Sequence, residues 1–218
     1  MPGTALVWDT PGERTYEAGT KKGVLWVQNT NGTYGTGVAW DGLVGVTQSP
    51  SGAEEQPMYA DDIKYAAPRS KEEFGGTIEC FKTPDAFDEC DGTSAIAEGV
   101  TVGQQGRKSF AFSYQSTIGN DTDGFDYGYK IHLIYGATAS PSEKAHSTIN
   151  ESPEGVTFSY EFTTLPVEVA GFKPTSIITI DSTKVDATKL ASFEAIIYGS
   201  TEADSRLPMP DEVATHFA

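Results

Sequence analysis

The feature that most constrains the fold is a regular alternation of apolar and polar side chains in three separate segments. In residues 108–117, aromatic side chains occupy alternate positions from Phe110 to Tyr114. The same period of two returns in residues 129–135 and 156–162. Successive side chains of a β-strand point to opposite faces of its sheet, so this period predicts half-buried strands with one apolar face.

Shorter apolar segments predict further strands. They are expected at residues 24–27, 36–46, 76–82 and 176–181. In the second of these, Val38, Trp40, Val44 and Val46 share one face with Gly42. A turn-rich connection over residues 119–124 predicts a hairpin, and a polar loop is expected over residues 137–154. The pattern therefore predicts a mainly β fold, and the length of 218 residues suits a single domain over residues 1–218.

One long helix is predicted after Asp186, whose short carboxylate can accept hydrogen bonds from unpaired backbone N–H groups at a helix start. Its apolar stripe is formed by Leu190, Phe193 and Ile197. Gly199 can supply the left-handed residue at its end. A shorter helix is predicted from Pro84 to Cys90, with Thr83 as its cap and Pro84 in the first helical position. The expected architecture is a β domain with one long flanking helix.

Two further stretches are interpreted as an extended loop and an arm. Residues 49–62 combine turn-forming residues with several acids, and loops of this length inside compact domains are usually functional or disordered. Residues 204–218 contain two prolines and end close to the apolar Phe217. Both stretches are expected to extend from the domain.

The charge balance disfavours tight binding of nucleic acid. The chain has 15 Lys and Arg residues against 31 Asp and Glu residues, for a net charge of −16. Tight binding of nucleic acid needs cationic side chains that replace condensed counterions. An acidic surface past which DNA moves without sticking is compatible with this balance. The N-terminal residues show no secretory signal and no segment is long enough to span a bilayer, so we expect synthesis in the cytoplasm of the producing cell and no membrane association.

No sequence motif indicates catalysis. The histidines His132, His146 and His216 lie in polar surroundings, and we interpret them as solvated surface groups. No nucleophile elbow, zinc-protease motif or phosphate-binding loop occurs. Cys80 and Cys90 are interpreted as half-buried thiols that serve as small apolar groups, with a disulfide or redox pair as the alternative. We therefore expect no enzymatic activity and no cofactor.

The best metal candidates are Asp121, Asp123 and Asp126, which lie in one acidic turn. Calcium prefers several oxygen ligands from a tight loop. Alignment with a calcium-binding loop, however, places Gly119 and Lys130 on the two key ligand positions. The turn is therefore expected to be solvated, and these three carboxylates remain weak candidates only.

An ordered series of segments across nearly the whole chain resembles the major tail proteins, or tail tube proteins, of long-tailed siphophages of Gram-positive bacteria. The longest segment is YKIHLIYGATASPSEKA, residues 129–145. The others are residues 37–43, 51–54, 59–65, 73–79, 84–87, 118–122, 173–176, 180–185 and 204–208. None of these segments is a chemical signature by itself, and the resemblance depends on their order.

The resemblance implies a structural protein of the virion tail, made in the host bacterial cytoplasm. Its subunit would be a tail-tube-type β-sandwich or barrel-like domain with a flanking helix, and six subunits would close into rings that stack into a tube. Implied partners are other copies of the chain, the tail tip or initiator complex, the tape measure protein and the tail terminator protein. DNA would pass through the lumen without specific binding.

We further expect the extended loop and the C-terminal arm to contact neighbouring subunits. The expected contact residues are Glu54, Glu55, Met58, Tyr59, Asp61, Asp62, Leu207, Pro208, Met209 and Phe217. The alternative function is a carbohydrate-binding β-sandwich, in which exposed Trp8, Trp26 or Trp40 would stack against sugars. Because Trp40 shares a face with valines, it is expected to belong to the core instead.

Overall fold

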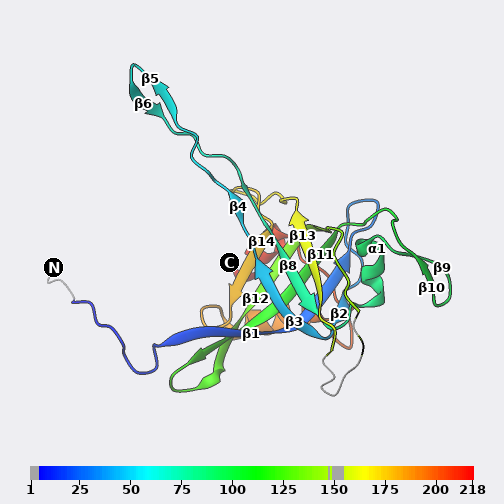
Figure 1. Ribbon diagram of the computed structural model, residues 1–218. Helices are drawn as coiled ribbons and strands as arrows, with labels where there is room; N and C mark the ends of the chain where they lie inside the picture. Colours follow the sequence, from blue (N-terminus) through cyan, green and yellow to red (C-terminus); the bar gives the residue numbers. More distant parts are fainter. Residues whose placement is uncertain (1–4, 147, 149–154) are drawn as a thin grey trace.

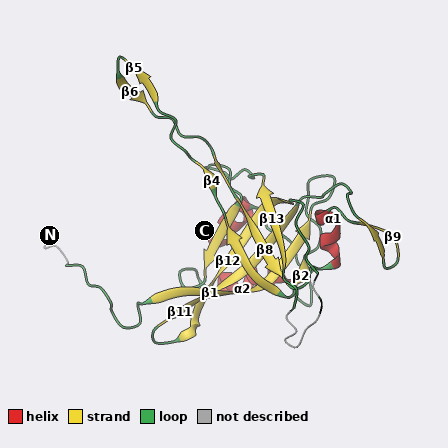
Figure 2. Ribbon diagram, viewed as in Figure 1, coloured by secondary structure: helices red, strands yellow, loops and turns green. Residues whose placement is uncertain are grey.

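The structure is a computed structural model that describes residues 5–146, 148 and 155–218. Its strands are β1 (Thr15–Val27), β2 (Val38–Trp40), β3 (Leu43–Gln48), β4 (Ser51–Gly52), β5 (Met58–Ala60), β6 (Ile63–Ala66), β7 (Glu72–Glu73), β8 (Gly75–Cys80), β9 (Ser94–Ala97), β10 (Val100–Val102), β11 (Phe110–Asn120), β12 (Gly124–Ala139), β13 (Phe158–Thr164) and β14 (Ile177–Asp181). Its helices are η1 (Asp85–Phe87), α1 (Asp88–Asp91), α2 (Ala187–Tyr198) and α3 (Pro210–Phe217). The prediction of a mainly β fold is confirmed (Figure 2).

One antiparallel sheet forms the body, with the strand order β2-β1-β11-β12-β13-β8-β3 and β14 as an additional partner of β12. The sheet curls so that β3 comes back into contact with β1 (Figure 1). The predicted strand at residues 36–46 is divided by Asp41 and Gly42 into β2 and β3. This division turns the chain, so that Val38 and Val44 are exposed while Trp40 is buried. The prediction of one shared apolar face is therefore wrong for this segment.

Two cores lie on the two faces of this sheet. The first is lined by aromatic side chains of β11, β13 and η1, among them Phe112, Tyr160 and Phe87. The second lies between the sheet and helices α2 and α3, and it includes Leu133 of β12 and Phe193 of α2. Because both faces are covered, all side chains from Phe110 to Gln115 are buried. The prediction that this segment is only half-buried is wrong for this reason.

Helix α2 begins as the sequence predicts. The Asp186 side chain accepts hydrogen bonds from the backbone N–H groups of Thr188 and Lys189, at 2.9 and 3.0 Å. The three residues of its predicted apolar stripe are all buried in the second core. At its end, Gly199 has a positive φ of 79°, but its ψ of 171° lies outside the left-handed helical region. The prediction of a left-handed helical residue at this end is therefore wrong, although the positive φ still favours glycine.

The other helices depart from the prediction. The short helix near residue 84 is capped by Pro84 itself, and no side chain, including that of Thr83, caps it. Helix α3 forms where an extended arm was expected, so the described part of the chain has a second helix beside the sheet. Its N-terminal Pro210 fits the first turn of a helix, where a missing backbone N–H costs nothing.

The sheet divides at Gly136, within β12. Before this residue, β12 pairs with β14, from Ile134–Ile177 back to Lys130–Asp181. After it, β12 continues to Ala139 and pairs with β13. The expected polar loop therefore starts later than predicted, and residues 147 and 149–154 of that loop lie outside the described residues.

Candidate functional site

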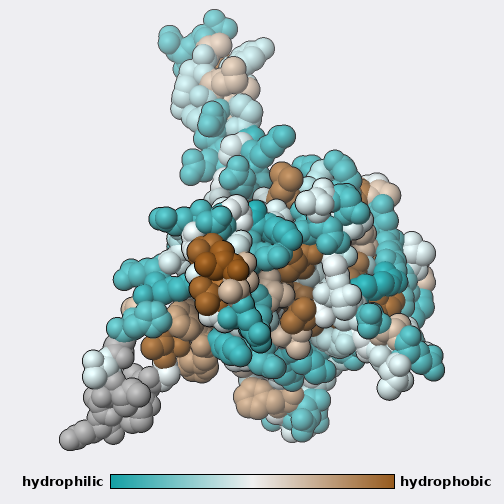
Figure 3. Space-filling view, turned by 90° about the vertical axis from the view of Figure 1, so that its right-hand side faces the viewer, coloured by the Kyte–Doolittle hydropathy of each residue, from teal (hydrophilic) through white to brown (hydrophobic). Residues whose placement is uncertain are grey.

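The most prominent surface feature is a long hairpin, here called the arm and comprising residues 49–74. Strands β4 and β7 pair at its base, and β5 and β6 pair at its tip. The arm projects away from the body (Figure 1) and stands clear of it in the space-filling view (Figure 3). Every residue from Thr47 to Glu73 is exposed, so the arm makes no core of its own with the domain.

The tip of the arm is a tight turn at Asp61 and Asp62. Both residues have positive φ angles, 51° and 59°, between the paired residues Ala60 and Ile63. Two positive φ angles in a two-residue loop suit the right-handed twist of a hairpin, and Asp tolerates this conformation better than most residues. The turn therefore presents two adjacent carboxylates at the extreme end of the molecule.

Large apolar side chains surround these carboxylates without being buried. Met58, Tyr59, Ile63 and Tyr65 expose 57%, 71%, 62% and 73% of their surface. An isolated two-stranded hairpin is marginally stable in water, and exposed apolar side chains on such a hairpin gain stability when another surface covers them. The arm is therefore expected to be marginally stable by itself and to become more stable when another surface covers its apolar side chains.

The structure brings six of the predicted contact residues together on the arm. They are Glu54, Glu55, Met58, Tyr59, Asp61 and Asp62. The predicted loop of residues 49–62 is one side of a hairpin that continues to residue 74, because β6 and β7 return along it. Glu55 forms an ion pair with Lys64 of the returning strand. Contact of these residues with a neighbouring subunit stays a prediction.

The other four predicted contact residues lie on a segment that folds back onto the body. Leu207 and Pro208 are buried, and the hydroxyl of Tyr135 donates a hydrogen bond of 2.9 Å to the carbonyl of Pro208. Phe217 packs against Phe193 of α2, with ring centres 5.2 Å apart. Met209 is exposed. The C-terminal residues 204–218 therefore do not extend as the expected arm, because their apolar side chains complete the second core.

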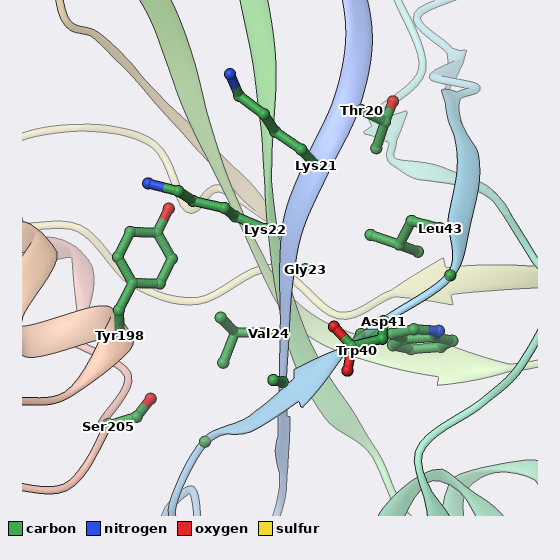
Figure 4. A pocket seen from close by; sticks show the side chains of 13 residues that line it. Thr20, Lys21, Lys22, Gly23, Val24, Trp40, Asp41, Leu43, Tyr198 and Ser205 are labelled. Atoms are coloured by element: carbon green, nitrogen blue, oxygen red, sulfur yellow. The ribbon is translucent and has the colours of Figure 1, made fainter.

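A groove of about 520 Å³ lies at the other end of the body, between β1, β2 and the end of α2. Lys21, Lys22 and Tyr198 lie at one side of it, and Trp40 and Leu43 at the other (Figure 4). The Nζ of Lys22 lies 5.2 Å from the centre of the Tyr198 ring, which is a cation–π contact. Neither lysine forms an ion pair within the described residues. Sequence reasoning missed this groove because α2 reaches it only through the tertiary fold.

The predicted metal candidates do not form a cluster. Asp121 accepts a hydrogen bond of 2.9 Å from the N–H of Gly12, and its carboxylate lies 4.0 Å from Arg14. Asp123 accepts a hydrogen bond from the side chain of Asn120. Among the described residues, no group of three His, Cys, Asp or Glu side chains is placed to hold a metal ion. The carboxylates of Asp121 and Asp123 instead hold the turn and the N-terminal segment together.

His132 is buried, which contradicts its interpretation as a solvated surface group. Its ring nitrogens lie 2.9 Å from the Ser116 hydroxyl and 3.2 Å from the Thr179 hydroxyl, and its ring stacks on Tyr114 at 4.6 Å. Burial lowers the pKa of His132 below its ordinary value. The side chains of Tyr114, Ser116 and Thr179 on the neighbouring strands surround the ring, which is why a polar context in the sequence does not mean exposure here.

The two cysteines are free, and both are fully buried, whereas the sequence interpretation made them half-buried. Burial raises the pKa of both thiols, that of Cys90 to about 12. A thiol must lose its proton to act as a nucleophile, so these two are held in their unreactive form. They contribute to the first core as small apolar groups.

Two of the three tryptophans proposed as sugar platforms lie in the cores. Trp26 has no exposed surface and Trp40 exposes 2%, whereas Trp8 exposes 75%. A sugar can stack only on an exposed ring face. The prediction that Trp40 belongs to the core is confirmed.

None of the helices in the described ranges has the length and apolar character that a bilayer crossing requires. No protein-family model matches the chain, and a search of the curated proteins finds no matching sequence.

Proposed function

We propose that this chain is a structural subunit that assembles with copies of itself, as the tail tube subunit of a siphophage does. Six copies would form a ring, rings would stack into a tube, and DNA would pass through its lumen. The observation that carries this proposal is the arm, whose residues from Thr47 to Glu73 are all exposed. Its apolar side chains need a partner surface, and the described part of the same domain provides none.

The sheet supports the same proposal. Strand β3 ends the order of the main sheet, and β2 ends it on the other side. Edge strands in a monomer invite pairing with other chains, and in a ring such edges become joining surfaces. A contact between two different surfaces of neighbouring copies closes into a ring when the rotation permits, and otherwise forms an open stack.

The net charge of −16 fits the passage of DNA. Phosphate groups are repelled by carboxylates, so a lumen lined by acidic side chains would not retain the polymer. Such a surface would serve a conduit and would be a poor site for specific recognition of bases. The carbohydrate-binding alternative is weakened, because two of its three candidate tryptophans are buried in the cores and cannot stack on a sugar.

Electron microscopy of negatively stained, concentrated protein tests the proposal. We expect hollow tubes or six-fold rings from the wild type. The matched variant replaces residues 53–71 by the turn Asn-Gly, which keeps the β4–β7 pairing at the base of the arm. We expect this variant to unfold at the same temperature as the wild type and to form no stacked polymer. A discrete, sugar-stabilised oligomer from the wild type, with no rings at any concentration, would contradict the proposal.

A further inference from the structure

We propose that the groove between β1, β2 and α2 receives the tip of the arm of a second copy of this chain. The inference rests on the proposed self-assembly and names the acceptor surface for the arm. In this contact, Asp61 and Asp62 at the tip lie against Lys21 and Lys22. The contact is heterologous, because each copy offers its arm at one end and its groove at the other.

The positions of the arm and the groove exclude a contact within one copy. The groove and the arm lie at opposite ends of β3, a strand of six residues. Leu43 at its start lines the groove, and Gln48 at its end leads directly into the arm. The arm continues away from the body (Figure 1), and its 13 residues from Ser49 to Asp61 span about 40 Å when extended. The tip therefore lies far from the groove of its own copy and can be received only by another.

The charges of the two surfaces are complementary. Lys21 and Lys22 are adjacent and exposed in a chain with a net charge of −16, and neither has an ion-pair partner within the described residues. Asp61 and Asp62 are adjacent and exposed in the same way, with no ion pair in the part of the chain that the structure describes. One carboxylate, Asp41, also lines the groove, but it lies beside Trp40 and away from the lysines (Figure 4). Opposite charges at this contact would orient the arriving arm.

The groove also offers apolar surface to the arm. Val24 and Leu43 line it together with the ring of Tyr198. The exposed Met58 and Tyr59 lie directly before the acidic turn of the arm. A contact that covers these side chains would remove apolar area from water, and this burial would add to the ion pairs, which contribute little when they are exposed.

The backbone of β1 is irregular at this place. Its pairing with β11 shifts between Ala18 and Lys21 and again between Lys21 and Val24. Lys22 has a φ of 51°, in the left-handed region that is unfavourable for a residue with a side chain. Irregularities of this kind redirect side chains, and here they direct two successive lysines toward the same side of β1 (Figure 4). Contact of the two lysines with an arriving arm would offset this unfavourable backbone conformation.

Charge reversal tests the inference. The double substitution Asp61→Lys with Asp62→Lys, and separately Lys21→Asp with Lys22→Asp, is expected to raise the concentration needed for polymer formation about tenfold or more. The chain that carries all four substitutions is expected to recover most of this loss, because the ion pairs form again in the opposite sense. The matched control, Glu72→Lys with Glu73→Lys, changes the charge equally at the base of the arm and is expected to polymerise like the wild type. Polymer is measured by sedimentation, and circular dichroism checks the fold of each variant.

Cross-linking tests the contact directly, whether or not the wild type forms tubes. Asp62→Cys and Lys22→Cys chains are mixed at high concentration under mild oxidation, while the native thiols remain buried. We expect disulfide-linked mixed dimers, and far fewer when Glu72→Cys replaces Asp62→Cys. Tubes without this cross-link, or with no recovery in the fourfold variant, would overturn the inference while leaving the proposed function intact. Absence of both tubes and mixed dimers would overturn the two together.

Discussion

Replacing Gly136 with alanine is expected to lower the free energy of unfolding by about 2–4 kcal/mol, because two separate costs add. Gly136 has a φ of +59°, and this region costs an alanine about 1–2 kcal/mol. An added Cβ would also lie 2.3 Å from the carbonyl oxygen of Leu165, whereas ordinary contacts begin at 3.4 Å. That carbonyl belongs to the backbone and cannot rotate away as a side chain could.

The second cost follows from the hydrogen bonds at this place. The N–H of Leu165 donates to the carbonyl of Gly136 at 2.9 Å, and the N–H of Gly136 donates to the hydroxyl of Tyr34 at 3.1 Å. Moving Leu165 away from the new Cβ strains the first of these bonds, and moving residue 136 instead strains both. Loss of one such bond costs about 0.5–1.5 kcal/mol, and an unpaired buried group costs more.

Gly124 provides a matched control on the same strand. Its φ is also +59°, but an added Cβ there meets nothing within 4 Å. Gly124→Ala therefore carries only the conformational cost, about 1–2 kcal/mol. The difference between the two variants isolates the clash with Leu165. Urea unfolding followed by the fluorescence of the buried Trp26 and Trp40 measures both. If the two variants unfold within about 0.5 kcal/mol of each other, the close approach of the Leu165 carbonyl to Gly136 is refuted.

Three further predictions concern a cap, a buried histidine and the arm. Asp186→Ala should cost about 1 kcal/mol of stability and Asp186→Asn much less, since asparagine keeps the acceptor oxygen; equal losses in urea unfolding would contradict the cap. Burial lowers the pKa of His132 in the folded state below its ordinary value of 6.5, so below pH 6.5 the unfolded chain binds a proton at this residue more readily than the folded chain. The free energy of unfolding should therefore fall as the pH falls from about 6.5 toward the lower folded-state pKa. His132→Asn should show a shallower fall of the free energy of unfolding over the same pH range, and an unchanged slope would show that the ring is not the group that titrates. Tyr59→Ser with Ile63→Ser should leave the unfolding temperature of the isolated subunit within about 2 °C of the wild type while it reduces sedimentable polymer, because both side chains are exposed; a clear loss of thermal stability would mean that the arm packs within the subunit.

Local patterns in the sequence were sufficient to locate most of the strands and the long helix. The alternation at residues 108–117 requires a strand, because only a period of two places Phe110, Phe112 and Tyr114 on one face. Asp186 marks the start of α2, because its carboxylate accepts hydrogen bonds from backbone N–H groups that have no partner within the helix. These signals concern neighbours in the chain, and neighbours in the chain stay neighbours in any fold.

What covers the second face of a strand was decided by the tertiary structure alone. Ser113 and Gln115 are polar, and the alternation assigned them to a solvent face, yet both are buried beside α2. His132 was assigned to solvent for the same reason and is buried as well. The C-terminal residues 204–218 were expected to extend, and Leu207 and Val213 instead complete the second core.

The two candidate contact surfaces, the arm and the groove, also differ in how far the sequence alone predicted them. The sequence indicated an acidic, turn-rich stretch with Met58 and Tyr59, because its composition cannot form a core by itself. It did not indicate that this stretch is one half of a hairpin, since the pairing of β5 with β6 depends on the turn at Asp61 and Asp62. The sequence did not indicate the groove at Lys21 and Lys22, because β1, β2 and α2 meet there only when the sheet curls and α2 packs across the sheet. Contacts between residues close in sequence follow from local chemistry, whereas a surface shared by distant segments exists only once the chain has folded.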